Sequence, residues 1–147
     1  MRFGTVVRVS VAGLLALSLM AGSGFAQAKM SLYERLGGKE AITAVVDEFV
    51  ARVAADSRIN RFFEGTEIKT LKMHLFNQIC EASGGPCKYT GRSMKDAHRG
   101  MGVGSGDFDA LVENLVGALD KFKVGKPEKD QLLAVLGPMQ KDIVEKK

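Results

Sequence analysis

Apolar residues recur at intervals of three and four along most of the chain, whereas the strict alternation typical of strands is nearly absent. Residues 39–55, 66–83 and 107–122 each carry their large apolar side chains on one face of a helix. A last helix is expected over residues 127–143, with Pro138 kinking it or shifting its register. The pattern predicts an all-α domain.

Shorter elements separate these helices. A short helix is expected at residues 31–36, a single turn of helix at 59–63 and another short helix at 93–99, the first two ended by glycines. Between them, residues 83–91 are rich in glycine and contain a proline, which is typical of a loop. The domain is therefore expected to bring its long helices together across flexible, glycine-rich connections.

The N-terminal segment differs in composition from the rest of the chain. Two arginines precede an apolar stretch at residues 9–20, and the small-x-small sequence Ala-Gln-Ala follows at residues 26–28. This arrangement is typical of a secretory signal peptide, so we expect residues 1–28 to be removed and residues 29–147 to form one domain, exported to the bacterial periplasm. An uncleaved segment that anchors the protein to the membrane is the alternative; after cleavage we expect no stable membrane insertion.

The charge of the chain gives little indication of a partner. The formal net charge of +4 falls to +2 without the two arginines of the expected signal peptide, and acids and bases are interspersed. A nucleic-acid surface calls for clustered bases with aromatic residues between them, so no nucleic-acid partner is expected. The C-terminal run at 141–147 mixes Asp142 and Glu145 with its lysines, and we interpret it as a solvated helix end.

The two cysteines lie on either side of a turn-forming sequence. Cys80 and Cys87 flank Gly84-Gly85-Pro86, and an oxidising compartment favours a disulfide between them. Two independent thiols are the alternative. A zinc site that combines the cysteines with the two histidines is a poorer interpretation, because the spacing matches no usual zinc finger.

The chain contains two histidines, and each shares a helical face with apolar residues. His74 lies on the face of Leu71 and Leu75, and His98 lies on the face of Met94. Taken alone, either histidine is ordinarily a packed side chain with a hydrogen-bonded nitrogen. A site that needs an imidazole as a metal ligand or a general base must nevertheless use one of these two.

Considered together, the histidines suggest a cofactor site. Two helices joined by a glycine-rich loop can face each other across a gap, each presenting an imidazole within an apolar wall. Haem fits such a gap, because it buries an apolar macrocycle, takes an axial imidazole and needs cationic or hydroxyl groups near its propionates. Candidates for that rim, any of which is equally suited to ordinary surface, are Lys72, Tyr89, Thr90 and Arg92.

Several motifs occur in a characteristic order along the chain. They are Ser31-Leu32-Tyr33, Leu36-Gly37-Gly38, Phe62-Phe63, Gly84-Gly85-Pro86, Tyr89-Thr90-Gly91, Met94 and His98. In this order they resemble a group 1 truncated haemoglobin over residues 31–145, and the absence of tryptophan argues against the other two truncated groups. The resemblance implies a two-over-two helical sandwich around a haem, with His98 as the proximal iron ligand and Phe63 packed against the haem on the distal side.

The resemblance also implies a set of haem contacts. They are expected from Phe63, Leu71, Lys72, Leu75, Tyr89, Arg92, Met94 and His98. Apolar lining or general core is expected from Phe49, Phe62, Phe76, Leu111 and Leu115. Because no histidine follows His98 and no Cys-x-x-Cys-His motif occurs, the cofactor is expected to be haem b, bound without a covalent link.

The distal side departs from the family pattern. Oxygen-handling members typically carry a tyrosine at the position of Val50 and glutamines at the positions of Leu71, Leu75 or both, and here all three residues are aliphatic. Aliphatic side chains offer no hydrogen-bond donor to a bound gas. His74 falls where some members carry a histidine that binds the iron as a sixth ligand, so bis-histidine ligation is expected, with an open distal pocket as the alternative.

Three functions follow from the resemblance. The first is reversible binding of a small diatomic gas, namely oxygen, nitric oxide or carbon monoxide, with His74 controlling access. The second is one-electron transfer in the periplasm with a redox partner. The third is an enzymatic activity such as nitric oxide dioxygenation or a peroxidase-like reaction, which is less favoured because the sequence shows neither a polar oxygen donor nor a reductase.

Overall fold

The computed structural model describes residues 29–146, so the expected signal peptide lies outside the described residues. Helical elements account for the regular structure of this part of the chain. They are α1 (Leu32–Arg35), α2 (Gly38–Ala55), η1 (Asn60–Phe63), α3 (Ile68–Ala82), α4 (Met94–His98), α5 (Ser105–Lys121), α6 (Lys126–Leu136), η2 (Gly137–Met139) and α7 (Gln140–Ile143). Within residues 29–146 no strand forms, and the all-α prediction is confirmed.

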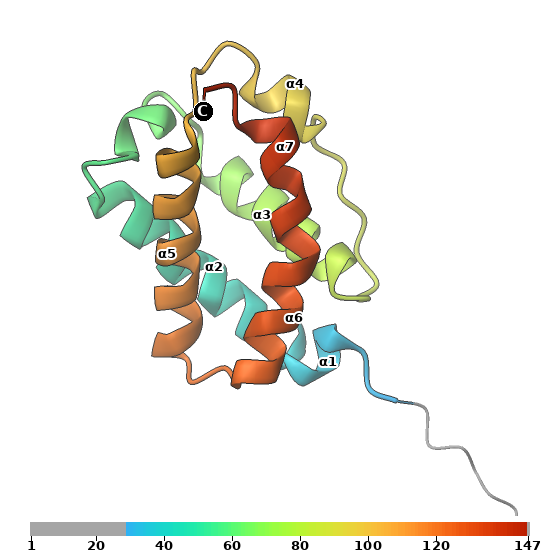
Figure 1. Cartoon of the computed structure of the whole chain (residues 1–147). Helices are drawn as coiled ribbons and strands as arrows, with labels where there is room; N and C mark the ends of the chain where they lie inside the picture. The colour runs from blue at the N-terminus through green and yellow to red at the C-terminus, as the bar shows by residue number, and fades with distance from the viewer. Residues whose placement is uncertain (1–28, 147) are drawn as a thin grey trace, which may run out of the picture.

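The long helices form two layers. Figure 1 shows α2 and α3 crossing behind α5 and α6, which run antiparallel to each other in front. Helix α2 packs against both α3 and α5, and α3 also contacts α6. The expected apolar face of α2 is buried in this interface, through Ile42, Val45, Val46, Phe49, Val50 and Val53. Burial of these side chains provides the hydrophobic stabilisation that holds the two layers together.

Side-chain caps start the helices that carry the two histidines. The carboxylate of Glu67 accepts hydrogen bonds from the backbone N–H groups of Lys69 and Thr70 at the start of α3. The Ser93 hydroxyl accepts one from the backbone N–H of Asp96 at the start of α4. Such caps satisfy N–H groups that have no partner in the helix itself, which fixes where each helix begins.

Pro138 shifts the register of the last helix, as expected. The chain passes from α6 through the 3₁₀ turn η2 into α7, which ends at Ile143. The expectation of a solvated helix end at residues 141–147 is wrong for residues 144–146. These residues leave the helix and run against the loop that follows α4, where Gly104 and Lys146 form an isolated bridge.

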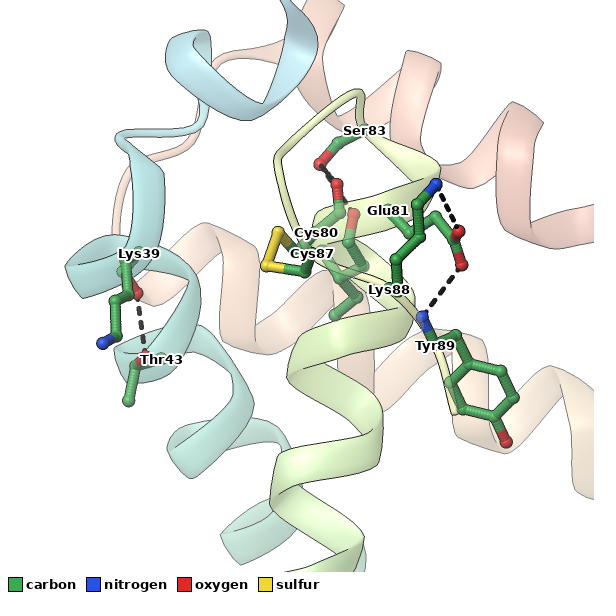
Figure 2. The surroundings of a disulfide bond; sticks show 9 residues. Lys39, Thr43, Cys80, Glu81, Ser83, Cys87, Lys88 and Tyr89 are labelled. Atoms are coloured by element: carbon green, nitrogen blue, oxygen red, sulfur yellow. Dashed lines mark hydrogen bonds and ion pairs between the residues drawn. A yellow bond between two sulfur atoms is a disulfide. The ribbon is translucent and has the colours of Figure 1, made fainter. Parts of the chain in front are cut away.

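Cys80 and Cys87 form a disulfide, with 5.7 Å between their Cα atoms (Figure 2). It joins the last turns of α3 to the loop that leads toward α4.

In residues 29–146 no group of three or more histidine, cysteine, aspartate or glutamate side chains is placed to hold a metal ion, so the zinc interpretation gains no support. Over the same residues, no helix has the length and apolar character needed to cross a membrane.

Candidate haem-binding site

A cavity of about 590 Å³ opens between the two helical layers and the short helix α4. Its volume lies within the roughly 300–1,000 Å³ typical of sites for cofactors and drug-sized ligands. Its walls are mostly apolar and come from α2, η1, α3, α4, α5 and the C-terminal helices. Both histidines of the chain line this cavity, so the structure brings together the two residues that the sequence singled out.

His98 lies at the end of α4 with one ring nitrogen already engaged. Its Nδ1 is 2.7 Å from the backbone oxygen of Met94. Because a carbonyl oxygen only accepts, Nδ1 must carry the proton and donate this hydrogen bond. The lone pair of Nε2 is then available as a metal ligand, and the hydrogen bond fixes the ring and increases its basicity.

The C-terminal segment holds the loop that follows His98. The Glu145 carboxylate accepts hydrogen bonds from the backbone N–H groups of Gly100 and Gly102, each at 2.6 Å. Both glycines adopt left-handed backbone angles, which side-chain-bearing residues rarely adopt. The two N–H donors lower the pKa of Glu145 below its usual value. In the sequence, the only indication of this contact of Glu145 is an acidic residue within the lysine-rich C-terminal segment.

His74 lies on α3 and has a different environment. Its Nδ1 is buried, and within residues 29–146 no hydrogen-bond partner lies near that atom. The edge of the ring packs against Tyr89, with 5.8 Å between ring centroids and 65° between ring planes. The imidazole is therefore held by packing and by its helix, and its second nitrogen lacks the partner that His98 has.

Three aliphatic side chains line the cavity together with His74. Val50, Leu71 and Leu75 all line the cavity, as the departure from the family pattern predicted. A nearby amide, that of Gln78, also lines it, but its nitrogen donates to the sulfur atoms of Met94, at 3.3 Å, and Met139, at 3.4 Å. The Gln78 amide is therefore occupied by the two thioethers, and the three aliphatic side chains add no hydrogen-bond donor to this side of the cavity.

Most of the residues expected to contact haem line the cavity. These are Phe63, Leu71, Leu75, Tyr89, Arg92 and Met94, together with both histidines. Lys72 and Thr90 lie outside the lining, and Lys72 Nζ instead forms an ion pair with Asp47 at 2.9 Å. The ion pair holds the Lys72 ammonium group against α2, and a haem-rim role for Lys72 stays a prediction.

The apolar lining was anticipated only in part. Phe49, Phe62, Leu111 and Leu115 line the cavity, whereas Phe76 packs against the general core. The sequence missed Phe108, Met139 and Ile143, which complete the wall from the C-terminal half of the chain. Their helical apolar faces were visible, but periodicity does not distinguish a side chain that faces a cavity from one that faces the core.

The residues present fit a haem. An imidazole with a free Nε2 and a hydrogen-bonded Nδ1 suits an axial iron ligand, and the large apolar cavity suits the macrocycle. Arg92 is exposed yet lines the cavity, which places a cation where a propionate would meet solvent. Two crossed pairs of helices around such a cavity, with a histidine on the short helix α4, define a globin.

Comparisons with known proteins agree with that class. The family described as bacterial-like globin matches residues 31–145. A group 1 truncated haemoglobin from Mycolicibacterium paratuberculosis is 35% identical over 113 residues, which cover 77% of this chain and 83% of that protein. The crystal structure of the ferric truncated haemoglobin from Tetrahymena pyriformis has a TM-score of 0.76 and 32% identity, covering 78% of this chain and 98% of that one.

A further solved structure is similar to a comparable degree. The two-over-two haemoglobin from Synechococcus, in the cyanomet state with covalently attached haem, has a TM-score of 0.75 and 35% identity, covering 80% of this chain and all of that one. The chain therefore belongs to the bacterial-like globin family, among the group 1 truncated haemoglobins. It is a haem-binding globin.

Proposed function

We propose that this globin reversibly binds a small diatomic gas at a haem iron held by His98, with His74 as a second, displaceable ligand. The observation that carries the proposal is that the two histidines of the chain line one cavity together with the aliphatic residues Val50, Leu71 and Leu75. Haem, when bound, supplies an iron atom with one coordination position beyond the one that His98 takes. His74 then competes with the gas for that position.

The unequal partners of the two imidazoles support the displaceable role of His74. Binding through Nε2 requires the proton on Nδ1, and in His98 the carbonyl of Met94 accepts that N–H. In His74 the same proton would be buried, and within the described residues it would meet no acceptor. His74 is therefore the weaker ligand and the one that an incoming gas replaces.

The cofactor proposed is haem b without a covalent link. The related Synechococcus protein was crystallised with covalently attached haem. The present sequence has no histidine after His98 and no Cys-x-x-Cys-His motif to form a comparable bond. Export to the periplasm, based on the composition of residues 1–28, is also part of the proposal and accords with the disulfide.

Absorption spectra of the purified protein test this proposal. Low-spin six-coordinate spectra are expected in both the ferric and the ferrous state, and carbon monoxide should convert the ferrous form to its adduct. Extraction with acidified organic solvent should release unmodified haem b. A protein that purifies without haem and takes up none would contradict the globin function, and a five-coordinate spectrum would contradict the role of His74.

The second candidate function is one-electron transfer. The aliphatic residues Val50, Leu71 and Leu75 favour it, because they offer no hydrogen-bond donor to a bound gas, while the same cavity is lined by two imidazoles. A redox partner in the periplasm would then exchange electrons with the protein. Fast electron self-exchange combined with slow gas binding would favour this candidate, whereas rapid, reductant-sustained consumption of nitric oxide would favour an enzyme.

A further inference from the structure

Tyr89 contacts His74 from a segment outside the helix that carries the histidine. The Tyr89 ring lines the cavity and meets the His74 ring edge to face. Its hydroxyl donates a hydrogen bond to the backbone oxygen of Arg92 at 2.7 Å, so the polar end of the side chain is occupied by its own loop.

The loop that carries Tyr89 is fastened to the end of α3 at several points. The disulfide joins Cys80 to Cys87, two residues before Tyr89. The Glu81 carboxylate accepts a hydrogen bond from the backbone N–H of Tyr89 at 3.0 Å and pairs with Lys88 Nζ at 3.1 Å. Figure 2 shows both interactions beside the disulfide, with the Tyr89 ring projecting away from the sulfur atoms.

The geometry of Gly91 shows how closely the ring is confined. A Cβ atom added there would collide with the Tyr89 ring and its hydroxyl oxygen. The ring thus lies between its own loop and His74, and it has little room to move away from the histidine. His74 has no hydrogen bond at Nδ1 among the described residues, so packing has to set the orientation of its ring.

We propose that Tyr89 is a positioning residue for His74, held in place by the loop that the Cys80–Cys87 disulfide closes. The inference rests on the proposed function, because it concerns His74 as a ligand of haem iron. The Tyr89 ring keeps the imidazole oriented toward the cavity in place of the missing hydrogen bond. Removing the ring, displacing it or opening the loop loosens His74 and weakens its bond to iron.

Three variants of the haem-loaded protein test the ring itself. Tyr89→Ala removes the ring, Tyr89→Phe keeps the ring but loses the hydroxyl, and Gly91→Ala pushes the unaltered tyrosine aside. Gly106→Ala is the matched control, because a Cβ there meets nothing within 4 Å. The measurements are the six-coordinate fraction in the absorption spectrum, the rate of carbon monoxide binding to the ferrous protein, and the contact between the two rings by NMR in the ferrous, carbon monoxide-free state.

The alanine variant at Tyr89 and the Gly91 variant are expected to lower the six-coordinate fraction and to accelerate carbon monoxide binding by about two- to tenfold, the range for loss of one aromatic pair. Tyr89→Phe and Gly106→Ala should match the wild type. Cys80→Ala/Cys87→Ala, which opens the loop without a reductant, should shift both measurements in the direction of Tyr89→Ala. Thermal unfolding of each haem-loaded variant identifies any that is globally destabilised.

The outcomes separate this inference from the function on which it rests. A wild type without haem, or with five-coordinate iron, overturns the ligand role of His74 and the inference together. A six-coordinate wild type whose Tyr89→Ala and Gly91→Ala variants behave like it overturns the positioning role alone. Equal effects of Tyr89→Phe and Tyr89→Ala would also overturn it, because the hydroxyl rather than the ring would then be responsible.

Discussion

The α4 side of the cavity and the α3 side each present one imidazole, and they differ in what holds its second nitrogen. On the α4 side, Met94 accepts the hydrogen bond of His98, and Glu145 fastens the loop that follows. On the α3 side, the Nδ1 atom of His74 is buried and, in the described part of the chain, has no partner. The ring of His98 is therefore fixed with Nε2 free to bind a metal, whereas no hydrogen bond at Nδ1 fixes the ring of His74.

This difference has consequences for ligand exchange. A buried N–H without an acceptor costs about 1–3 kcal/mol, which corresponds to a factor of about 5 to 150 in an equilibrium constant. His74 is disfavoured as a ligand by this amount relative to an imidazole with a partner like that of His98. Under the proposed function, the iron would stay anchored on the His98 side and be exchangeable on the His74 side, although both ligands would be the same residue type.

The largest expected effect comes from removing His98, the imidazole whose Nδ1 is already hydrogen-bonded. His98→Ala should reduce haem affinity by more than about tenfold, since even loss of a residue that supports a metal ligand costs about 10- to 100-fold. Transfer of haem to apomyoglobin measures the loss. His74→Leu is the matched control and should retain haem far better. If the two variants lost haem at equal rates, the asymmetry between the two sides would be refuted.

The second prediction concerns His74, the ligand that a gas is proposed to displace. His74→Leu should convert the low-spin spectrum to a five-coordinate, high-spin one, because Leu cannot ligate and adjacent Leu71 and Leu75 cannot replace it. Carbon monoxide binding should accelerate by about tenfold or more, since the competing ligand is gone. Stopped-flow mixing measures the rate. An unchanged spectrum would mean that His74 is a packed side chain only.

The sequence predicted the helices well, because long amphipathic faces and glycine breaks are local features, whereas their two-layer arrangement was predicted only through the family resemblance. Helix α2, for example, begins and ends within a residue of the expected 39–55. A shared site for His74 and His98 was suggested by the glycine-rich loop between their helices, and the family resemblance then gave each histidine a separate role. The Glu145 clamp could not be predicted, because it joins residues 43 and 45 positions apart through backbone N–H groups.

The direction in which a side chain points was the second feature that could not be predicted from the sequence. Lys72 and Tyr89 carry the same kind of signal in the sequence, a polar group near the expected rim. In the structure Lys72 pairs with Asp47 on the neighbouring helix, whereas Tyr89 turns into the cavity and contacts His74. The direction of Lys72 follows from its position on α3 and that of Tyr89 from the path of the loop after the disulfide, and composition reveals neither.

A hydrogen-bond donor introduced on α3 should reduce the difference in hydrogen-bonding groups between the α3 side and the α4 side of the cavity. In a His74→Leu background, Leu75→Gln introduces an amide at one of the two positions where the family resemblance leads us to expect glutamine. One added hydrogen bond should slow oxygen dissociation by roughly tenfold, equivalent to about 1.4 kcal/mol. Leu75→Met in the same background keeps an apolar side chain of similar volume and should leave the rate nearly unchanged. Flash photolysis in oxygenated buffer measures both, and equal rates would show that position 75 does not reach the gas.

The smallest effect is expected from changing Glu145, whose carboxylate holds the loop that follows His98. Glu145→Gln removes the charge that two backbone N–H groups stabilise, so the haem-loaded protein should unfold at a lower temperature near neutral pH. The folded protein holds the pKa of Glu145 below its usual value, so the carboxylate stabilises the fold above the unfolded pKa and loses this contribution as the pH falls through the folded value. The difference in Tm between wild type and variant should therefore be constant from pH 6 to 8 and shrink below about pH 4.5.

Glu113→Gln, on the exposed side of α5, controls for general loss of a surface carboxylate. A Tm difference that persists unchanged in acid would show that the Glu145 contribution does not come from its ionised form.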